Sequence, residues 1–405
     1  MKHPVVVGLQ YGDEGKGKIT DVLARQADWV IRFNGGNNAG HTLWLNGKKL
    51  VTHSVPSGVL SPHARNYIGA GCVVDPYALK QELKELREAG AALDSDRLKI
   101  DFRSHVILPI HRALDAAREA GPLGIGTTKR GIGPTYSTKT DRLGLRVGEV
   151  AKPEAEERIR ILCHAYNPLL KAAGLPESTE EENLKGLEVA RNLFTADFLS
   201  LENAPFYDVA KREKCVLEGA QAILLDIDHG NYPFVTSSNT LAAYAAVGTP
   251  FPSTKLGLII GVAKAYVTRV GMGPFETELN DETGERLRQK GGEFGATTGR
   301  PRRCGWLNAD DLREGVRLSD CHAIVMTKAD VLTKEPRVLV KLKGEMVTFE
   351  GWPTLIQENG ALHPNLETFI SAVEKHAGAP IIAVGTGADR ADLFWRKPIP
   401  DFWAD

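Results

Sequence analysis

The sequence predicts an α/β protein in which helices flank a large, mostly parallel central sheet. Short apolar runs recur along the 405 residues, and segments with helical periodicity lie between them. Continuous apolar runs of this kind are typical of strands that are covered on both faces. A glycine-rich loop with lysines follows the first run, which indicates a P-loop-like architecture with elaborations.

Seven apolar runs are expected to form strands. They occupy residues 5–9, 29–33, 72–74, 106–110, 256–263, 323–326 and 380–384. The clearest helix spans residues 75–90, where Asp75 can cap the first turn and Pro76 fits within it. A second helix is expected over residues 19–25. Functional residues of such a fold gather in the loops at the carboxyl ends of its strands.

The chain is expected to form a single elaborated domain, residues 1–405. Residues 150–200 have a mostly helical and charged pattern, which predicts a helical insertion, and residues 331–370 have mixed signals. A linker rich in proline, glycine and serine flanks neither segment.

Composition excludes several classes of protein. Fifty Lys and Arg against 51 Asp and Glu give a formal charge of -1, which argues against a nucleic-acid partner. No apolar run approaches the roughly 20 residues that a membrane-spanning helix needs, and the N-terminus does not have the pattern of a signal peptide. Five cysteines without a CxxC pair support neither a zinc knuckle nor a disulfide framework. We therefore expect a cytoplasmic protein with no membrane partner.

The loop after the first run has the sequence GDEGKGK and satisfies the pattern GxxxxGK. Its glycines let backbone N–H groups approach phosphate, and its lysines neutralise charge. Ile19 stands where Ser or Thr usually binds magnesium, and an acidic pair lies inside the loop. A carboxylate here would repel a nucleotide unless it binds metal or acts as a base, which makes Asp13 a catalytic candidate. The alternative is a glycine-rich turn with solvated charges.

The second glycine-rich loop, FNGGNNAGHT, follows the run at residues 29–33. Its glycines permit a ligand to approach the backbone closely, and an imidazole can transfer protons near neutral pH. A functional His41 is favoured over a structural one, and Asn37 and Asn38 lie beside it.

The string TKAD at residues 327–330 follows the run at 323–326 and has the TKxD pattern that reads guanine. A carboxylate accepts from the two neighbouring donors of guanine, which adenine does not present. Together with GxxxxGK it favours GTP over ATP, although alone it is also compatible with a helix cap. The loop at 385–387 either closes over the base or simply turns the chain.

Two further loops combine hydroxyls, glycines and cations. Residues 296–303 (ATTGRPRR) hold three arginines, whose guanidinium forks match carboxylate and phosphate, and residues 126–134 (GTTKRGIGP) are similar. An anionic small ligand and a solvated basic loop both remain open. Asp226, Asp228 and His229 match no zinc or EF-hand spacing, so a structural role is favoured for them.

Eight short sequence strings, spread over nearly the whole chain, resemble those of a known protein family and occur in the same order. They are QYGDEGKGK, GGNNAGHT, GTTKRGIGPTY, EGAQAILLDIDHGNYPFVTSSNT, TRVGMGPFETEL, EFGATTGRPRRCGW, TKAD and GTGADR. The sequence resembles the adenylosuccinate synthetase family of GTP-dependent carbon–nitrogen ligases. The resemblance implies ligation of L-aspartate to IMP through 6-phosphoryl-IMP, yielding adenylosuccinate, GDP and phosphate. This is the first committed step of AMP synthesis from IMP.

The resemblance also assigns roles to residues. Asp13 would remove the proton from the purine ring and bind one Mg2+ per subunit together with the backbone oxygen of Gly40, while His41 would assist phosphoryl transfer. The implied GTP contacts are Gly12, Asp13, Glu14, Gly15, Lys16, Gly17, Lys18, Arg302, Lys328, Ala329, Asp330, Gly385, Thr386 and Gly387.

The implied IMP contacts are Asp13, Lys16, Asn38, Ala39, Gly40, His41, Thr128, Arg142, Gln221, Thr236 and Arg300. The implied aspartate contacts are Thr297, Thr298, Arg300 and Arg302. Arg142 would reach the nucleotide of the partner subunit in a homodimer. Three departures from the family pattern are Lys129, Pro301 and the pair Ala222-Ile223.

Two alternatives stay open. A sister branch of the family acts on dGMP and typically lacks the aspartate that stands here as Asp13, so its retention favours IMP. A GTP-binding switch would need a DxxG string after a strand, and the strings at 141–144 and 281–284 follow no apolar run. A GTP-binding switch would also leave His41 and the arginine loop, residues 296–303, without a function.

Overall fold

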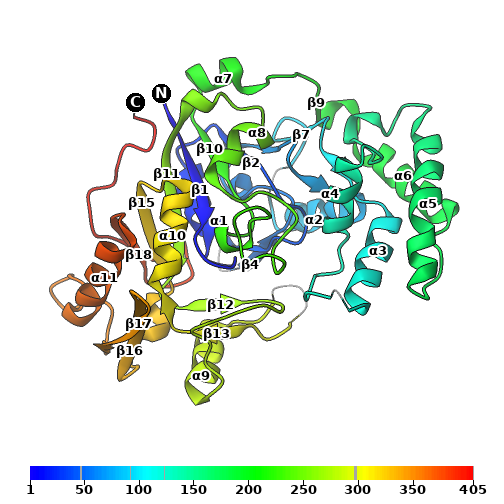
Figure 1. Ribbon diagram of the computed structural model, residues 1–405. Helices are drawn as coiled ribbons and strands as arrows, with labels where there is room; N and C mark the ends of the chain where they lie inside the picture. Colours follow the sequence, from blue (N-terminus) through cyan, green and yellow to red (C-terminus); the bar gives the residue numbers. More distant parts are fainter. Residues whose placement is uncertain (46–47, 92, 123, 296–298, 405) are drawn as a thin grey trace.

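A ten-stranded sheet forms the centre of the protein (Figure 1). The computed structural model describes residues 1–45, 48–91, 93–122, 124–295 and 299–404. The strand order is β19-β18-β15-β11-β1-β10-β2-β5-β7-β9, and only the edge pair β18/β19 is antiparallel. The predicted α/β class with a mostly parallel sheet is therefore confirmed.

The strands of this sheet are short. Their bounds are β1 (His3–Gly8), β2 (Trp29–Arg32), β5 (Arg65–Ile68), β7 (Leu98–Asp101), β9 (Leu199–Ser200), β10 (Cys215–Glu218), β11 (Leu256–Lys264), β15 (Ala323–Thr327), β18 (Ile381–Gly385) and β19 (Leu393–Trp395). Every residue of β1 is buried, with Val5 opposite Leu217 on one side and Ile259 on the other. Burial on both faces explains the continuous apolar runs.

Two of the seven expected strands lie outside the large sheet. The run at 72–74 forms β6 (Val73–Val74), which pairs only with β8 (His105–Val106) from the run at 106–110. The second run ends early because Pro109 starts helix α3, where a missing N–H costs nothing. Both runs thus contain a buried strand as predicted, but each strand has only two residues and neither joins the large sheet.

Helices cover both faces of the sheet. Their bounds are α1 (Lys16–Ala24), α2 (Pro76–Glu88), α3 (Pro109–Ala120), α4 (Ile132–Thr140), α5 (Ala155–Ala172), α6 (Glu180–Leu193), α7 (Phe206–Arg212), α8 (Ala245–Gly248), α9 (Glu282–Gly291), α10 (Ala309–Ser319) and α11 (Pro364–Ala377). Asp75 caps α2 as predicted, since its Oδ1 accepts from the N–H groups of Tyr77 and Ala78. Helices α5 and α6 occupy the predicted helical segment and share an apolar cluster with α2 and α3.

Smaller elements complete the chain. The small strands are β3 (His41–Leu45), β4 (Lys48–Thr52), β12 (Val267–Arg269), β13 (Arg303–Gly305), β14 (Leu307–Asn308), β16 (Arg337–Leu342) and β17 (Glu345–Glu350). The 3-10 helices are η1 (Ser57–Leu60), η2 (Val147–Glu149), η3 (Ala196–Phe198), η4 (Ile223–Leu225), η5 (Ala242–Tyr244), η6 (Ser253–Lys255) and η7 (Ala329–Leu332). Within the described ranges, no helix combines the length and apolarity needed to cross a bilayer.

The parallel arrangement brings distant loops to one edge of the sheet. The loops that follow β1, β2, β10, β11, β15 and β18 all leave from carboxyl ends of neighbouring parallel strands. These loops carry most of the chemically distinctive strings of the sequence. The sheet edge is therefore the place where a site is assembled.

Candidate functional site

The predicted phosphate loop, residues 12–18 after β1, is shaped from inside by Glu14. Its buried Oε1 accepts from the N–H groups of Gln10 (3.1 Å) and Gly12 (2.8 Å), and its Oε2 lies 2.6 Å from Lys16 Nζ. A Cβ on Gly8 would lie 2.5 Å from this Oε2, so the strand end must be glycine. The Glu14 side chain thus faces the interior of the loop, which leaves only its backbone for a nucleotide.

Lys18, the lysine of GxxxxGK, points away from the pocket described below. Its Nζ donates to the carbonyl oxygens of Gly387 (3.0 Å) and Asp392 (2.6 Å), and burial lowers the pKa of this amine. Arg390 Nε also forms an ion pair with Asp21 Oδ2, at 3.1 Å, and Asp21 belongs to α1 like Lys18. These contacts hold the loop after β18 against α1.

The TKAD loop lies beside both of these segments. Thr327 Oγ1 donates to the carbonyl oxygen of Glu14 (2.6 Å), and a Cβ on Gly385 would lie 3.2 Å from Thr327 Cα. Asp330 Oδ1 is buried without a hydrogen-bond partner among the described residues, and burial raises the pKa of this carboxyl. The structure thus brings together the two loops predicted to enclose a guanine, and leaves an acceptor oxygen unpaired there.

His41 is held by a buried carboxylate that our sequence reasoning missed. Its Nδ1 lies 2.6 Å from Glu218 Oε1 at the end of β10, and Ser57 donates to the same carboxylate. Burial lowers the pKa of His41, and Arg32 lowers it further, against the opposing effect of Glu218. An ionised carboxylate only accepts, and its 2.6 Å contact is shorter than the 3.1 Å contact of Nδ1 with Arg32 Nη2, so we assign the hydrogen to Nδ1, which leaves Nε2 for chemistry.

Glu218 is ionised at neutral pH despite its burial. Burial alone would raise its pKa, but Arg32 and His41 lower it to about 2. A carboxyl whose folded pKa is depressed stabilises the fold above its unfolded pKa, and this contribution is lost as the pH falls toward 2.

The Glu218→Gln variant should therefore lose about 3 kcal/mol of unfolding free energy at pH 7. Its stability should also decline less steeply than that of the wild type as the pH falls below 4.5. Guanidinium unfolding curves at several pH values between 7 and 3 measure both effects. Parallel pH profiles for the two proteins would contradict the assigned ionisation.

Asp13 adopts a left-handed backbone conformation, with φ of 60°, and its side chain is 28% exposed. Its Oδ2 lies 2.9 Å from Arg302 Nε, and Arg302 Nη1 lies 2.7 Å from Glu293 Oε2. One arginine therefore joins the carboxylate of the phosphate loop to a second, buried carboxylate at residue 293.

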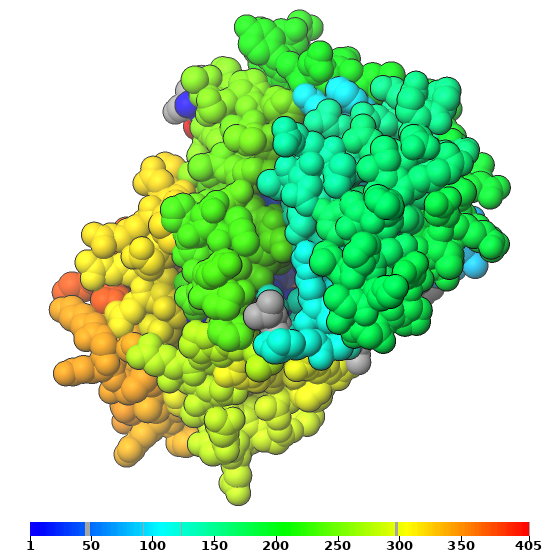
Figure 2. All heavy atoms as spheres, turned by 45° about the vertical axis from the view of Figure 1, so that its right-hand side comes forward, coloured from blue at the N-terminus to red at the C-terminus, as the bar shows by residue number. Residues whose placement is uncertain are grey.

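A pocket of about 350 Å³ opens between these loops, with Asp13 on its wall. Figure 2 shows the surface hollowed between the green segment around residues 221–237 and the cyan segment around 115–134. Its lining includes these predicted site residues: Gly12, Asp13, Lys16, Asn38, Ala39, Gly40, His41, Thr128, Gln221, Thr236 and Arg302.

Other predicted residues lie elsewhere. Arg142 is exposed at the end of α4, and neither it nor Arg300 lines the pocket. Thr297 and Thr298 fall outside the described residues. Of the departures from the family pattern, Lys129 is exposed, while the pair Ala222-Ile223 is buried at the start of η4.

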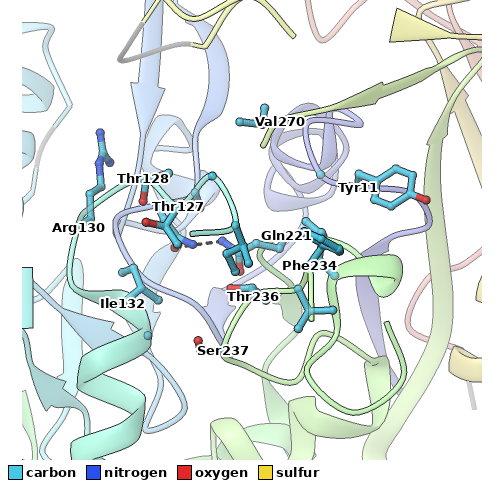
Figure 3. Close-up of a pocket in the computed structure, with 18 of the residues that line it drawn as sticks. Tyr11, Thr127, Thr128, Arg130, Ile132, Gln221, Phe234, Thr236, Ser237 and Val270 are labelled. Carbon is cyan, nitrogen blue, oxygen red and sulfur yellow. Dashed lines mark hydrogen bonds between the residues drawn. The ribbon is translucent and has the colours of Figure 1, made fainter. Parts of the chain in front are cut away.

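Two amide side chains, Gln221 and Asn38, line the pocket and are hydrogen-bonded to each other (Figure 3). Gln221 has a φ of 58°, and its Nε2 donates to Asn38 Oδ1 at 3.1 Å, the bond drawn as a dashed line. Gln221 Oε1 is buried without a partner among the described residues. Thr236 lies next to Gln221 in the same view. An acceptor is therefore available to a ligand that carries a donor.

Helix α3 holds the loop that covers one side of the pocket. The Glu119 carboxylate accepts from the N–H groups of Ile125, Gly126 and Thr127, and Asp115 accepts from Thr127 Oγ1 at 3.0 Å. These acids fix the backbone that presents Thr128. Sequence reasoning missed them because neither belongs to the motif that they support.

The Asp/His group at 226–229 has a structural arrangement. Asp226 is fully buried and accepts from the backbone N–H groups of Asp228, His229 and Thr240. Among the described residues, no group of three His, Cys, Asp or Glu side chains is placed to hold a metal ion. A metal in this protein would need oxygens from fewer side chains, completed by backbone or ligand oxygens.

Known proteins resemble this chain over almost its whole length. The sequence model described as "Adenylosuccinate synthetase" matches residues 5–343. The adenylosuccinate synthetases of Anaeromyxobacter sp. (strain Fw109-5) and Trichlorobacter lovleyi are each 42% identical to it. The aligned regions cover 96% and 98% of this chain and 97% and 99% of those proteins.

Solved structures agree. The fully ligated adenylosuccinate synthetase of Plasmodium falciparum superposes with a TM-score of 0.86 at 34% identity, over 98% of this chain and 100% of that one. The succinoaminodeoxyadenylate synthetase of cyanophage S-2L, bound to dGMP and dATP, has a TM-score of 0.68 at 21% identity over 97% and 95% of the two chains, a likeness of fold alone. From the sequence match and the shared fold, this chain belongs to the adenylosuccinate synthetase family.

Proposed function

We propose that this protein joins L-aspartate to IMP with GTP as the phosphoryl donor, and releases adenylosuccinate, GDP and phosphate. The observation that carries the proposal is a carboxylate, Asp13, within a phosphate loop and on the wall of a base-sized pocket. A carboxylate in a phosphate loop repels the phosphates of a nucleotide unless it transfers a proton or binds a metal ion. Relatives at 42% identity bear the name of this activity.

The reaction proceeds in two displacements. Asp13 accepts the proton of the purine nitrogen beside the 6-oxo group, so that this oxygen can attack the γ-phosphorus of GTP while GDP leaves. The amine of aspartate then attacks carbon 6 of the purine, phosphate leaves with the former oxo oxygen, and the departing phosphate takes up the proton that the amine nitrogen loses. His41 Nε2 assists the transferred phosphoryl group, and Gln221 with Asn38 orients the base.

A magnesium ion would be held by the Asp13 carboxylate and the Gly40 carbonyl oxygen. Both residues line the pocket, and oxygen donors suit this cation, which keeps several ligands from water and phosphate. When bound it supplies positive charge to the phosphates. The protein would therefore supply few of the magnesium ligands, and oxygens of water and phosphate would supply the others.

Selection of GTP over ATP is assigned to Asp330. Its unpaired, buried oxygen would accept from the donor pair of guanine, while adenine would leave it unpaired at a cost of about 1 to 3 kcal/mol. Lys328 and the loop 385–387 would enclose the base. Arg142, which is exposed outside the pocket, is proposed to act across the interface of a homodimer.

A coupled assay of phosphate release tests the proposal by omitting IMP, aspartate or GTP in turn. Each omission should abolish turnover. The dGMP-specific alternative is tested by replacing IMP, and equal or faster turnover with dGMP would overturn the assignment to IMP.

A GTP-binding switch is the competing class. Its DxxG string should follow a strand, whereas Asp141 ends α4 and Asp281 caps α9. GTP hydrolysis without IMP separates the two classes, because a ligase should be nearly silent. Substantial IMP-independent hydrolysis would favour the switch.

Arg302→Leu should raise the KM for aspartate by at least about tenfold. The reason is the loss of a charge-assisted contact worth about 1.5 to 3 kcal/mol between the guanidinium and a substrate carboxylate. Initial rates at saturating IMP and GTP give this KM. Arg303→Leu is a control at a neighbouring arginine, which pairs with Glu278 and does not line the pocket. An unchanged aspartate KM in Arg302→Leu would remove Arg302 from the aspartate site.

A further inference from the structure

One buried carboxylate, Glu293, contacts three cations. Its side chain is fully buried, two residues after α9. Glu293 Oε1 lies 3.1 Å from Lys264 Nζ and 2.9 Å from Lys328 Nζ, and Glu293 Oε2 lies 2.7 Å from Arg302 Nη1. Burial would raise its pKa, but the three cations hold it below the usual range.

Two of these cations belong to different functional loops. Lys328 stands in the TKAD loop after β15, and its Nζ also donates to the Gly291 carbonyl (2.5 Å). Arg302 belongs to the arginine loop, residues 296–303, and contacts Asp13 with its Nε. The third cation, Lys264, ends β11, is completely buried and does not line the pocket.

We infer that Glu293 is a positioning residue that fixes Lys328 and Arg302 relative to each other, and so aligns the guanine loop with the aspartate site. The inference rests on the proposed function, because that function assigns the two cations to two substrates. A long lysine and a long arginine lose side-chain freedom when held, and a carboxylate that holds both before binding removes part of that cost from each ligand.

A merely structural role is the alternative. Lys264 is buried and charged, and Glu293 could be present only to neutralise it. The two roles differ in one respect that can be measured. Neutralising Lys264 matters for stability, whereas positioning Lys328 and Arg302 matters for the affinity of GTP and aspartate.

Glu293→Gln should raise the KM values for GTP and for aspartate together, each by about tenfold or more, because both cations lose a charge-assisted partner. The KM for IMP should change less than about threefold by the same reasoning, since no contact among the described residues joins Asn38, Thr128 or Gln221 to Glu293. Glu293→Asp keeps the charge and should recover part of the loss.

The double variant Glu293→Gln/Lys264→Met decides between the roles, and it also removes the risk that the unpaired Lys264 unfolds the single variant. We expect a melting temperature near that of the wild type but the same raised KM values for GTP and aspartate. Recovery of both KM values in the double variant would overturn the inference.

Glu335→Gln is the matched control. Glu335 is a buried carboxylate that pairs with Arg286 and Lys290 on α9, and none of the three lines the pocket. It should affect stability without raising either KM. Equal KM effects of Glu335→Gln and Glu293→Gln would also overturn the inference.

Calorimetric titration with GTP alone separates this inference from the proposed function. If the wild type does not turn over IMP and aspartate, the proposed function is refuted. The positioning of Lys328 would still be supported if the double variant bound GTP with a Kd at least about tenfold weaker than that of the wild type. An unchanged Kd in a folded double variant would refute it, whatever the turnover.

Discussion

Asp13→Asn is expected to lower kcat by at least about 1000-fold while the Kd for GTP changes less than about threefold. Proton transfer by a positioned base contributes about 100- to 10,000-fold, and the loss of a metal ligand adds to this effect. Both contributions are made mainly in the transition state, so ground-state binding of GTP survives. Asparagine is preferred to alanine because Asp13 has a positive φ, which asparagine tolerates.

Phosphate release gives kcat, and calorimetry gives the Kd for GTP. Asp320→Asn is the matched control, since Asp320 also has a positive φ, of 51°, but ends α10 away from the pocket. The control should retain wild-type rates. Wild-type rates in Asp13→Asn would remove Asp13 from the chemistry and with it the main argument for a ligase.

His41→Asn is expected to lower kcat by about 100- to 10,000-fold, because the imidazole that assists the phosphoryl group is lost. The KM for aspartate should move little, since aspartate is assigned to other residues. Asparagine keeps an amide that can donate to Glu218, which limits the structural damage around this buried carboxylate.

His63→Asn provides the comparison, because His63 is exposed and does not line the pocket. A melting curve for each variant separates loss of fold from loss of chemistry. If His41→Asn keeps both its fold and its kcat, the ring serves only to fill the space beside Glu218.

Site residues that lie within a sequence motif could be predicted, because the motif itself indicates their chemistry. Asp13 and His41 each lie in a glycine-rich string directly after an apolar run, and the structure places both strings at one sheet edge. Apolar runs gave the positions of β1, β2, β11, β15 and β18, whereas the equally buried β10 was missed because only three apolar residues precede Glu218. The runs at 72–74 and 106–110 form strands outside the large sheet, because a short apolar run does not reveal which partner a strand will have.

The supporting carboxylates could not be predicted, because their importance arises from contacts between distant parts of the chain. Glu218 lies 177 positions from His41, and Glu293 lies 35 from Lys328. One signal was available: Glu218 is an acidic residue at the end of a buried apolar strand, where an unpaired charge would be costly. Glu293 is the first residue of the string EFGATTGRPRRCGW, but the resemblance assigned it no role.

The contact of Lys18 with Gly387 and Asp392 has a consequence for biosynthesis. The region that would receive the nucleotide joins residues that are synthesised far apart in time, since the two contacts span 369 and 374 positions of the chain. A growing polypeptide that stops short of Gly385 lacks one wall of that region, so we expect GTP capture to begin only after the ribosome has added residues 385–392.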